Sequence, residues 1–244
     1  MSVLKHLLLT FCFIILSKMA FASEQLVVAV GLAKPPYVIQ EFDTGFELDL
    51  IRNLLKEMGK STKFVYTQFG HSSKMLKVKA VDAVMTTNKS VFSDSTKLSD
   101  TYITYQNVAI SLKSSQLTIN TIADLANYSI ASFQKADMVL GQAFADAVDQ
   151  SPAYMKVAEQ SRQPKLLLKK RVEVLVMDKN IFSYFARTQG IEDIQEQFVF
   201  HPIFPESYYR MAFKNQKYVE DFNKTFAKYK LTNEYLALKK RYNL

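Results

Sequence analysis

Three stretches decide the fold: LVVAV at residues 26–30, FELDLIRNLLKEMG at residues 46–59 and VDAVM at residues 81–85. The first and third are near-continuous apolar runs, which are typical of strands buried on both faces of a parallel sheet. In the second, apolar residues recur at helical spacing and Gly59 is suited to end a helix. A strand, a helix and a further strand in this order indicate an α/β fold.

A second α/β block follows from about residue 113. Strands are expected at 128–133 and 172–177, with a helix at 158–169 before the second strand and another at 179–188 directly after it. Helical sequence closes the chain from residue 218 to about residue 241. The sequence therefore predicts two α/β units in series, and it contains no low-complexity tract or short-period repeat.

The first 22 residues have the pattern of a secretory signal peptide. Lys5 and His6 form a short positive region, an apolar run at 7–16 follows, and Ala20 and Ala22 are small residues at a cleavage site. An uncleaved membrane anchor is the alternative, but the apolar run is too short to span a bilayer. We therefore expect export to the periplasm, with residues 1–22 removed.

Charge and cysteine content exclude several classes of protein. The chain carries 31 basic and 23 acidic residues, a net charge of +8, and its basic residues are spread along the sequence. Such a spread does not favour a nucleic-acid interface, and we expect no nucleic-acid partner. The one cysteine lies in the expected signal peptide, so a Cys-based metal site, a redox pair and a thiol nucleophile are excluded. We expect neither a metal nor a cofactor.

Several short motifs, taken in order, resemble the periplasmic solute-binding proteins of the amino-acid transport type, extracellular family 3. The likeness covers nearly all of the chain after residue 22. Its carriers are Pro35-Pro36-Tyr37, Gly45-Phe46-Glu47-Leu48-Asp49-Leu50-Ile51, Val81-Asp82-Ala83-Val84, Leu98-Ser99-Asp100-Thr101-Tyr102, Ile122-Ala123-Asp124-Leu125, the segment from Arg171 to Asp178, and Phe222-Asn223 with Tyr235 and Tyr242. Each motif is weak by itself, and their order and spacing together make the resemblance.

The resemblance implies a two-lobed α/β fold of the type II periplasmic-binding-protein kind, with two crossover hinge strands. Lobe 1 would consist of residues 23–110 and the returning segment 205–244, and lobe 2 of residues 111–204. Hinges are expected near 108–113 and 200–205. The solute would bind in the cleft between the lobes, where the carboxyl ends of the strands meet, and hinge motion would close the lobes on it.

The resemblance also implies positions for the binding residues. Phe69 is expected to stack on the solute, and Thr86 and Thr87 to offer hydroxyl groups. Asp178, at the end of a strand, would bind the ammonium group of the solute, and it is also suited to cap the helix that follows. Tyr37 and Lys34, beside the two prolines, are further candidates that would point into the cleft.

Two departures from the family pattern affect the carboxylate clamp. The family places an arginine shortly after the threonine pair, but no arginine lies between Arg52 and Arg162, and Lys89 is the candidate replacement. The Gly-Ser/Thr loop of the family is replaced by a segment that contains Lys135 and Asp137, and the charge of Asp137 would repel a carboxylate of the solute. These departures favour an amine-bearing or otherwise polar solute over an α-amino acid bound in the usual way.

The function expected from these features is import of the solute by an ABC-type transporter, with a permease as partner and a monomer as the working form. A sensory or partner-docking protein that acts with a membrane sensor is the alternative. A dehydratase-like enzyme on the same fold is a further one, because fold does not determine function. The sequence shows no nucleophile–base pair, and Glu47 and Asp49 are interpreted as structural, so we expect no catalytic residues.

Overall fold

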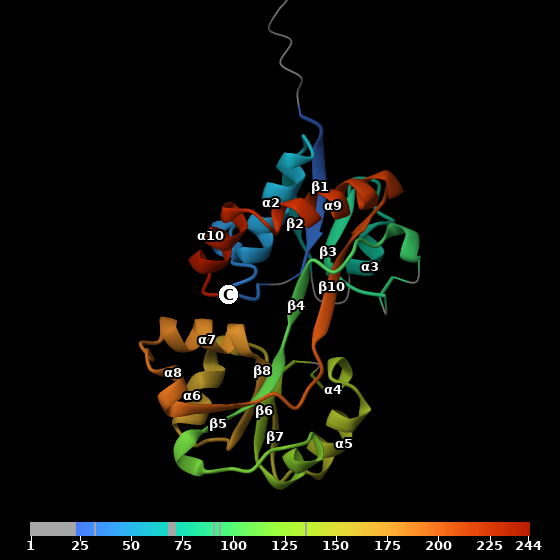
Figure 1. The fold of residues 1–244 in the computed structure, drawn as a ribbon. Coiled ribbons are helices and arrows are strands. Elements are labelled where there is room, and N and C mark those ends of the chain that lie inside the picture. The colour runs from blue at the N-terminus through green and yellow to red at the C-terminus, as the bar shows by residue number, and fades with distance from the viewer. Residues whose placement is uncertain (1–22, 32, 68–71, 90, 93, 135) are drawn as a thin grey trace, which may run out of the picture.

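The computed structural model describes residues 23–31, 33–67, 72–89, 91–92, 94–134 and 136–244 of the 244-residue chain. The expected signal peptide lies outside these residues, as do Phe69 and Lys135. The described chain forms two α/β lobes joined by extended segments (Figure 1). The predicted two-lobed α/β fold is therefore confirmed.

Lobe 1 is built on a five-stranded sheet in the order β2-β1-β3-β10-β4. Its strands are β1 (Gln25–Val30), β2 (Ser61–Tyr66), β3 (Ala83–Thr87), β4 (Ile103–Tyr105) and β10 (Ser207–Phe213). Its helices are α2 (Phe46–Glu57), α3 (Ser72–Met75), α9 (Gln216–Tyr229) and α10 (Asn233–Arg241), with 3-10 turns η1 (Gln40–Phe42) and η2 (Ser95–Lys97). Alternate residues of β1 pack on opposite faces of the sheet, Val28 against the main core and Ala29 against a small cluster that includes Leu98.

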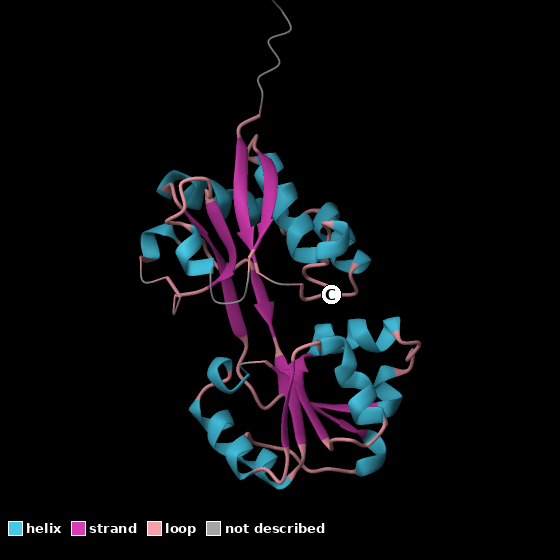
Figure 2. Cartoon of the chain, turned by 180° about the vertical axis from the view of Figure 1, so that it is seen from behind, coloured by secondary structure: helices cyan, strands magenta, loops and turns pink. Residues whose placement is uncertain are grey.

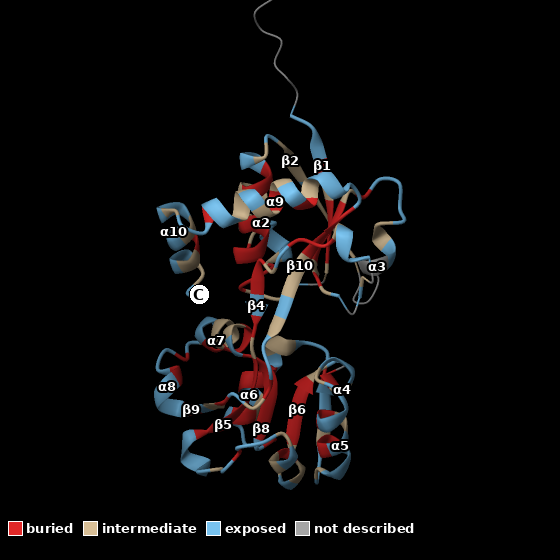
Figure 3. Cartoon of the chain, turned by 45° about the vertical axis from the view of Figure 1, so that its right-hand side comes forward, coloured by how far each residue is buried: buried red, intermediate tan, exposed pale blue. Residues whose placement is uncertain are grey.

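Lobe 2 repeats this arrangement with the order β7-β6-β8-β5-β9 (Figure 2). Its strands are β5 (Asn107–Leu112), β6 (Ile130–Phe133), β7 (Tyr154–Val157), β8 (Val174–Asp178) and β9 (Phe198–His201). Its helices are α4 (Ala136–Val139), α5 (Gln142–Gln150), α6 (Gln163–Leu168), α7 (Lys179–Thr188) and α8 (Ile194–Gln197), with 3-10 turns η3 (Lys113–Ser115), η4 (Ala123–Asn127) and η5 (Gln160–Arg162). The central strands of both lobes are almost wholly buried (Figure 3).

The chain crosses between the lobes twice. Gln106 alone separates β4 in lobe 1 from β5 in lobe 2, and residues 202–206 lead back from β9 to β10. In each sheet the fourth strand, β10 or β5, runs antiparallel to both of its neighbours. The lobe boundaries and the hinges stay predictions, since hinge motion requires a second arrangement of the lobes.

The structure differs from the sequence expectations in two places. Residues 154–157 form strand β7, which the sequence did not predict, and the expected helix at 158–169 is confined to η5 and α6. The helical sequence expected from residue 218 to about residue 241 forms two helices, α9 and α10, and Thr232 caps α10 by accepting a hydrogen bond from the Tyr235 amide. No helix among the described residues is long and apolar enough to cross a membrane.

Candidate functional site

The candidate site lies where the strands of the two lobes point at each other. The parallel strands β1 and β3 of lobe 1 end toward lobe 2, and β6 and β8 of lobe 2 end toward lobe 1 (Figures 1 and 3). Loops at the carboxyl ends of strands are where open α/β sheets bind ligands. Lys34, Tyr37, Thr86 and Asp178 all follow or end such strands.

The loop after β1 places Tyr37 between the lobes. The first amides of α2, at Phe46 and Glu47, donate to the carbonyl oxygens of Pro36 (2.9 Å) and Tyr37 (3.0 Å). These bonds satisfy two of the free N–H groups at the start of the helix. Gly45 makes the close approach feasible, because its φ is +129° and a Cβ there would collide with the Tyr37 backbone carbonyl.

Tyr37 connects lobe 1 with the end of β8 in lobe 2. Its hydroxyl donates to Asp178 Oδ1 (3.2 Å) and accepts from Asn180 Nδ2 (2.8 Å). Its ring stacks on Tyr105, with centroids 4.0 Å apart and an interplanar angle of 15°. The Tyr37 side chain is therefore fixed on both its polar and its apolar side.

Asp178 is a buried carboxylate that ends β8 and begins α7. As predicted, it is the N-cap of this helix, since Oδ1 accepts from the amides of Asn180 (2.9 Å) and Ile181 (3.0 Å). Oδ2 accepts from the amide of Gln106, the residue at the first crossing (3.0 Å). Burial raises the pKa of Asp178, and the hydrogen bonds oppose that shift. The role of Asp178 toward a solute stays a prediction.

A second buried carboxylate, that of Glu47, organises the lobe 1 side of the site. Glu47 Oε1 accepts from Thr86 Oγ1 (2.5 Å) and from the Tyr102 hydroxyl, and Oε2 accepts from the Tyr105 hydroxyl (2.8 Å). Burial raises the pKa of both tyrosines, so their hydroxyls stay protonated and remain donors. Glu47 is fully buried, and three hydroxyl groups converge on its charge.

Lys34 is the cation of this cluster. Its Nζ lies 3.8 Å from Glu47 Oε2 and 5.4 Å from the centre of the Tyr105 ring, and its side chain is 18% exposed. Burial lowers the pKa of Lys34, and the carboxylate of Glu47 opposes this shift. A long contact to one carboxylate leaves ammonium protons of Lys34 able to donate to another acceptor.

The other residues predicted for the site are placed less centrally. Thr87 is buried, and its hydroxyl has no hydrogen-bond partner among the described residues. Lys89 is exposed. Asp137, at the start of α4, is paired with Lys156 Nζ (2.8 Å), which lowers the pKa of Asp137. The structure thus brings Lys34, Tyr37, Thr86 and Asp178 together with Glu47, and the binding roles of all predicted residues stay predictions.

The sequence interpretation missed the place of Glu47 in the site. Position 47 lies on the same helical face as Leu50, Ile51 and Leu54, all of which are buried. A carboxylate on an apolar face must be paired or hydrogen-bonded when it is buried. That signal was present in the sequence and pointed to a buried polar cluster.

The arrangement offers charged and hydroxyl groups to a small molecule. Asp178 can accept from a cation and Lys34 can donate to an anionic group, while Thr86 Oγ1, whose proton is donated to Glu47, can accept from a donor of the solute. Within the described part of the chain, no group of three or more His, Cys, Asp or Glu side chains is arranged to hold a metal ion.

Comparison with protein families decides the membership of the chain. The sequence profile of the bacterial extracellular solute-binding proteins, family 3, matches residues 26–244. The chain belongs to this family. The resemblance inferred from the ordered motifs is therefore confirmed, and family membership assigns solute binding to the chain.

Solved structures share the fold of this family 3 protein at low sequence identity. An ancestral cationic amino acid solute-binding protein superposes with a TM-score of 0.70 at 20% identity, over 89% of this chain and 95% of the other. The GluR0 ligand-binding core in complex with L-glutamate gives 0.69 at 15% identity, over 91% and 99%. A histidine kinase sensor domain gives 0.68 at 14% identity, over 89% and 95%. No curated protein sequence matches the chain.

Proposed function

We propose that this protein binds a small, amine-bearing polar solute of the amino-acid type between its lobes, for import by an ABC-type permease. The carboxylate of Asp178 carries the proposal, because it is buried at the lobe interface and lies at the carboxyl end of a strand. Among the described residues, the lobe 1 side chain that donates a hydrogen bond to Asp178 is Tyr37, through its neutral hydroxyl. A solute ammonium in place of that hydroxyl would make a stronger, charge-assisted bond.

Lys34 is the candidate to meet an acidic or polar end of the solute. Lys89, the first candidate for the missing family arginine, is exposed, whereas Lys34 is largely buried beside Glu47 and Thr86. A lysine is a point charge and cannot reproduce the bidentate fork of arginine. We therefore infer that the solute's ammonium is held by Asp178 and that its other end is held less specifically than in the usual α-amino-acid site.

The remaining parts of the proposal follow from the family and from the sequence. The protein acts in the periplasm as a monomer, after removal of residues 1–22, and it binds its solute without chemical conversion. Sensing by a membrane-bound partner shares the same binding step, and similarity in fold to sensor domains does not separate the two roles. Uptake of labelled solute by cells with and without the gene separates them, since import requires the protein and sensing does not.

A thermal-shift screen of residues 23–244 tests the proposal. The panel contains amino acids, polyamines, quaternary amines, small peptides and organic acids. A ligand at about 100 times its Kd adds about 2.7 kcal/mol to the free energy of unfolding, a readily measured shift. We expect amine-bearing compounds to give shifts that Asp178→Asn abolishes, because the carboxylate of Asp178 would hold the ammonium group. Stabilisation by organic acids alone would contradict the proposed role of Asp178.

A further inference from the structure

A separate cavity lies between the lobes, on the far side of the crossing strands from α3 and α4. Helix α7 and the C-terminal turn lie on one side of β4 and β10, and α3 and α4 lie on the other, in each of the three views of the fold (Figures 1, 2 and 3). The cavity has a volume of about 240 Å³ and is lined by Pro36, Asn180, Ser183, Tyr184, Arg187, Thr188, Tyr242 and Asn243. Both lobes therefore contribute to its walls.

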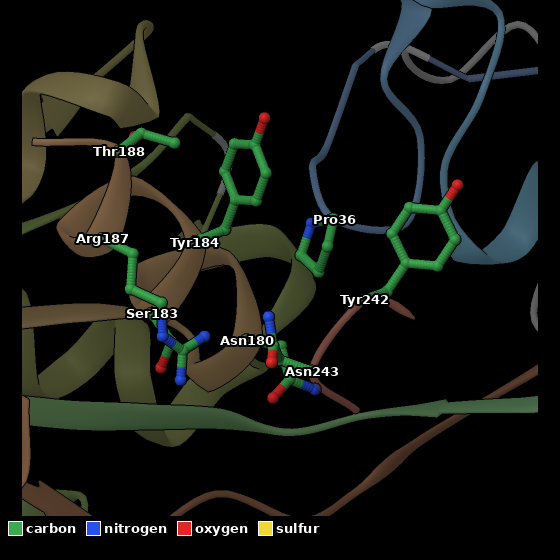
Figure 4. Close-up of a pocket in the computed structure, with 8 residues that line it drawn as sticks. All are labelled: Pro36, Asn180, Ser183, Tyr184, Arg187, Thr188, Tyr242 and Asn243. Atoms are coloured by element: carbon green, nitrogen blue, oxygen red, sulfur yellow. The ribbon is translucent and has the colours of Figure 1, made fainter. Parts of the chain in front are cut away.

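The cavity combines apolar walls with a polar end. The rings of Tyr184 and Tyr242 stand on either side of Pro36, while Arg187, Asn180 and Asn243 gather at one end (Figure 4). The α7 residues are spaced three and four positions apart, so they form one face of the helix. The Tyr242 hydroxyl is bonded outside the cavity, to Thr44 (2.8 Å) and Asp49 (2.5 Å), which leaves its ring as a wall.

Arg187 supplies an uncompensated positive charge to this cavity. Among the described residues its guanidinium has no hydrogen bond or ion pair, whereas Arg52 and Arg241 both contact Asp49 (2.6 and 3.7 Å). No acidic side chain is among the residues that line the cavity. Asp49, which lies behind Tyr242, is neutralised by these two arginines. The cavity is therefore electropositive, and its polar end is rich in donors.

We propose that this cavity is a second ligand site, for a small carboxylate that carries an aromatic or apolar body. The planar fork of Arg187 would bind the carboxylate in a bidentate manner, with the side-chain amides of Asn180 and Asn243 as further donors. The rings of Tyr184, Tyr242 and Pro36 would pack on the apolar body. The volume of about 240 Å³ equals that of about eight water molecules at ~30 Å³ each, which suits a ligand of about ten heavy atoms.

The second site would influence the arrangement of the lobes. Its occupant would touch α7 of lobe 2 together with Pro36 and the C-terminal turn of lobe 1, so it favours the arrangement in which they face each other. Asn180 links the two regions directly, because its side chain lines the cavity and donates to the Tyr37 hydroxyl (2.8 Å). The second site is distinct from the proposed solute site, which it adjoins at Tyr37.

Calorimetric titration of residues 23–244 with phenylacetate tests this proposal. Phenylacetate has a carboxylate and a phenyl ring, and phenylacetamide is its neutral analogue. We expect saturable binding of phenylacetate, with an affinity at least about 10-fold lower for R187Q and for the amide, because a charge-assisted hydrogen bond is lost. The amide NMR signals of α7 and Asn243 should shift on addition of phenylacetate to the wild type.

Arg171→Gln is the matched control, because Arg171 is an exposed arginine of lobe 2 whose side chain has no partner among the described residues. It should leave phenylacetate binding within about 2-fold of wild type, because it changes net charge alone. Circular dichroism establishes that both variants are folded. Equal affinity of R187Q and wild type would overturn the proposal, as would an equal loss in R171Q. The absence of saturable binding up to about 10 mM, well above a millimolar Kd, would overturn it too.

Discussion

Replacement of Glu47 by glutamine tests the buried cluster that shapes the lobe 1 side of the site. The variant keeps the shape of the side chain and removes its charge. Glu47 is fully buried, and its two oxygens accept hydrogen bonds from Thr86, Tyr102 and Tyr105. In glutamine one oxygen becomes an NH₂ group, which cannot accept, so at least one hydroxyl must reorient.

The expected loss follows from these contacts. With the amide oxygen toward Thr86 and Tyr102, two hydrogen bonds remain but lose their charge assistance, and the NH₂ group faces Tyr105 and Lys34. Hydrogen bonds to charged groups contribute about 1.5–3 kcal/mol each and neutral ones about 1 kcal/mol. Lys34 also loses the charge of its buried partner Glu47, which adds to this cost. The addition is small because the Lys34 side chain is 18% exposed. We expect the free energy of unfolding to fall by about 3 kcal/mol.

Urea unfolding of residues 23–244 measures this loss, with Glu57→Gln as the matched control. Glu57 is an exposed residue at the end of the same helix, so its change should stay within about 0.5 kcal/mol of wild type. The double variant K34M/E47Q should recover part of the loss, because it also removes the unpaired ammonium. A loss below about 1 kcal/mol for E47Q would refute the account of a buried, charge-assisted cluster.

Three further predictions concern the backbone at the site, pH and the link between the lobes. Gly45→Ala should lower the free energy of unfolding by more than about 2 kcal/mol, because φ is +129° and a Cβ at this position would meet the Tyr37 carbonyl. Gly59→Ala is the control and should lower it by about 1 kcal/mol, because Gly59 has φ +71° but open space around it. Equal losses in the two variants would contradict this reasoning. Burial lowers the pKa of His201 from 6.5, so its contribution to stability is present above that value and lost as pH falls through the folded-state pKa. The difference in unfolding free energy between wild type and H201Q should therefore decrease from pH 8 to pH 5. A difference that does not change with pH would contradict a lowered pKa of His201. Tyr37→Phe removes the bond to Asp178 (3.2 Å) and should increase the radius of gyration of the ligand-free protein in solution scattering, whereas an unchanged radius would show that this bond does not hold the lobes.

Much of the fold could be predicted because its signals are local. The apolar runs at β1 and β8 mark buried strands, and Asp178 before an amphipathic segment marks the start of α7, which spans the predicted residues 179–188. Strand β7 was missed because its residues Tyr154–Val157 are mostly polar or partly exposed and lie at the edge of the sheet. Its pairing with β6 is a tertiary interaction that local propensity does not report.

The places of several candidate residues in the fold could be predicted from the sequence, but their contacts could not. The family motifs singled out Lys34, Tyr37, Thr86 and Asp178, which the structure places at the junction of the lobes. The bond from Tyr37 to Asp178 joins residues 141 positions apart, and no local pattern could indicate it. Asp137 was expected to repel a carboxylate, but its pairing with Lys156 of β7 depends on the strand that the sequence did not reveal.

Calorimetric titration of the most stabilising amine, with wild type and Asp178→Asn, tests the proposed function most directly. Asparagine keeps the oxygen that caps α7 and removes the charge that the ammonium requires, while its NH₂ group replaces the oxygen that accepts from the Gln106 amide. Circular dichroism checks that the variant is folded. Asp149→Asn is the control, because Asp149 is an exposed carboxylate on α5 of lobe 2. We expect at least about 10-fold weaker binding for D178N and unchanged binding for D149N. Equal affinity of D178N and wild type would contradict the proposed function.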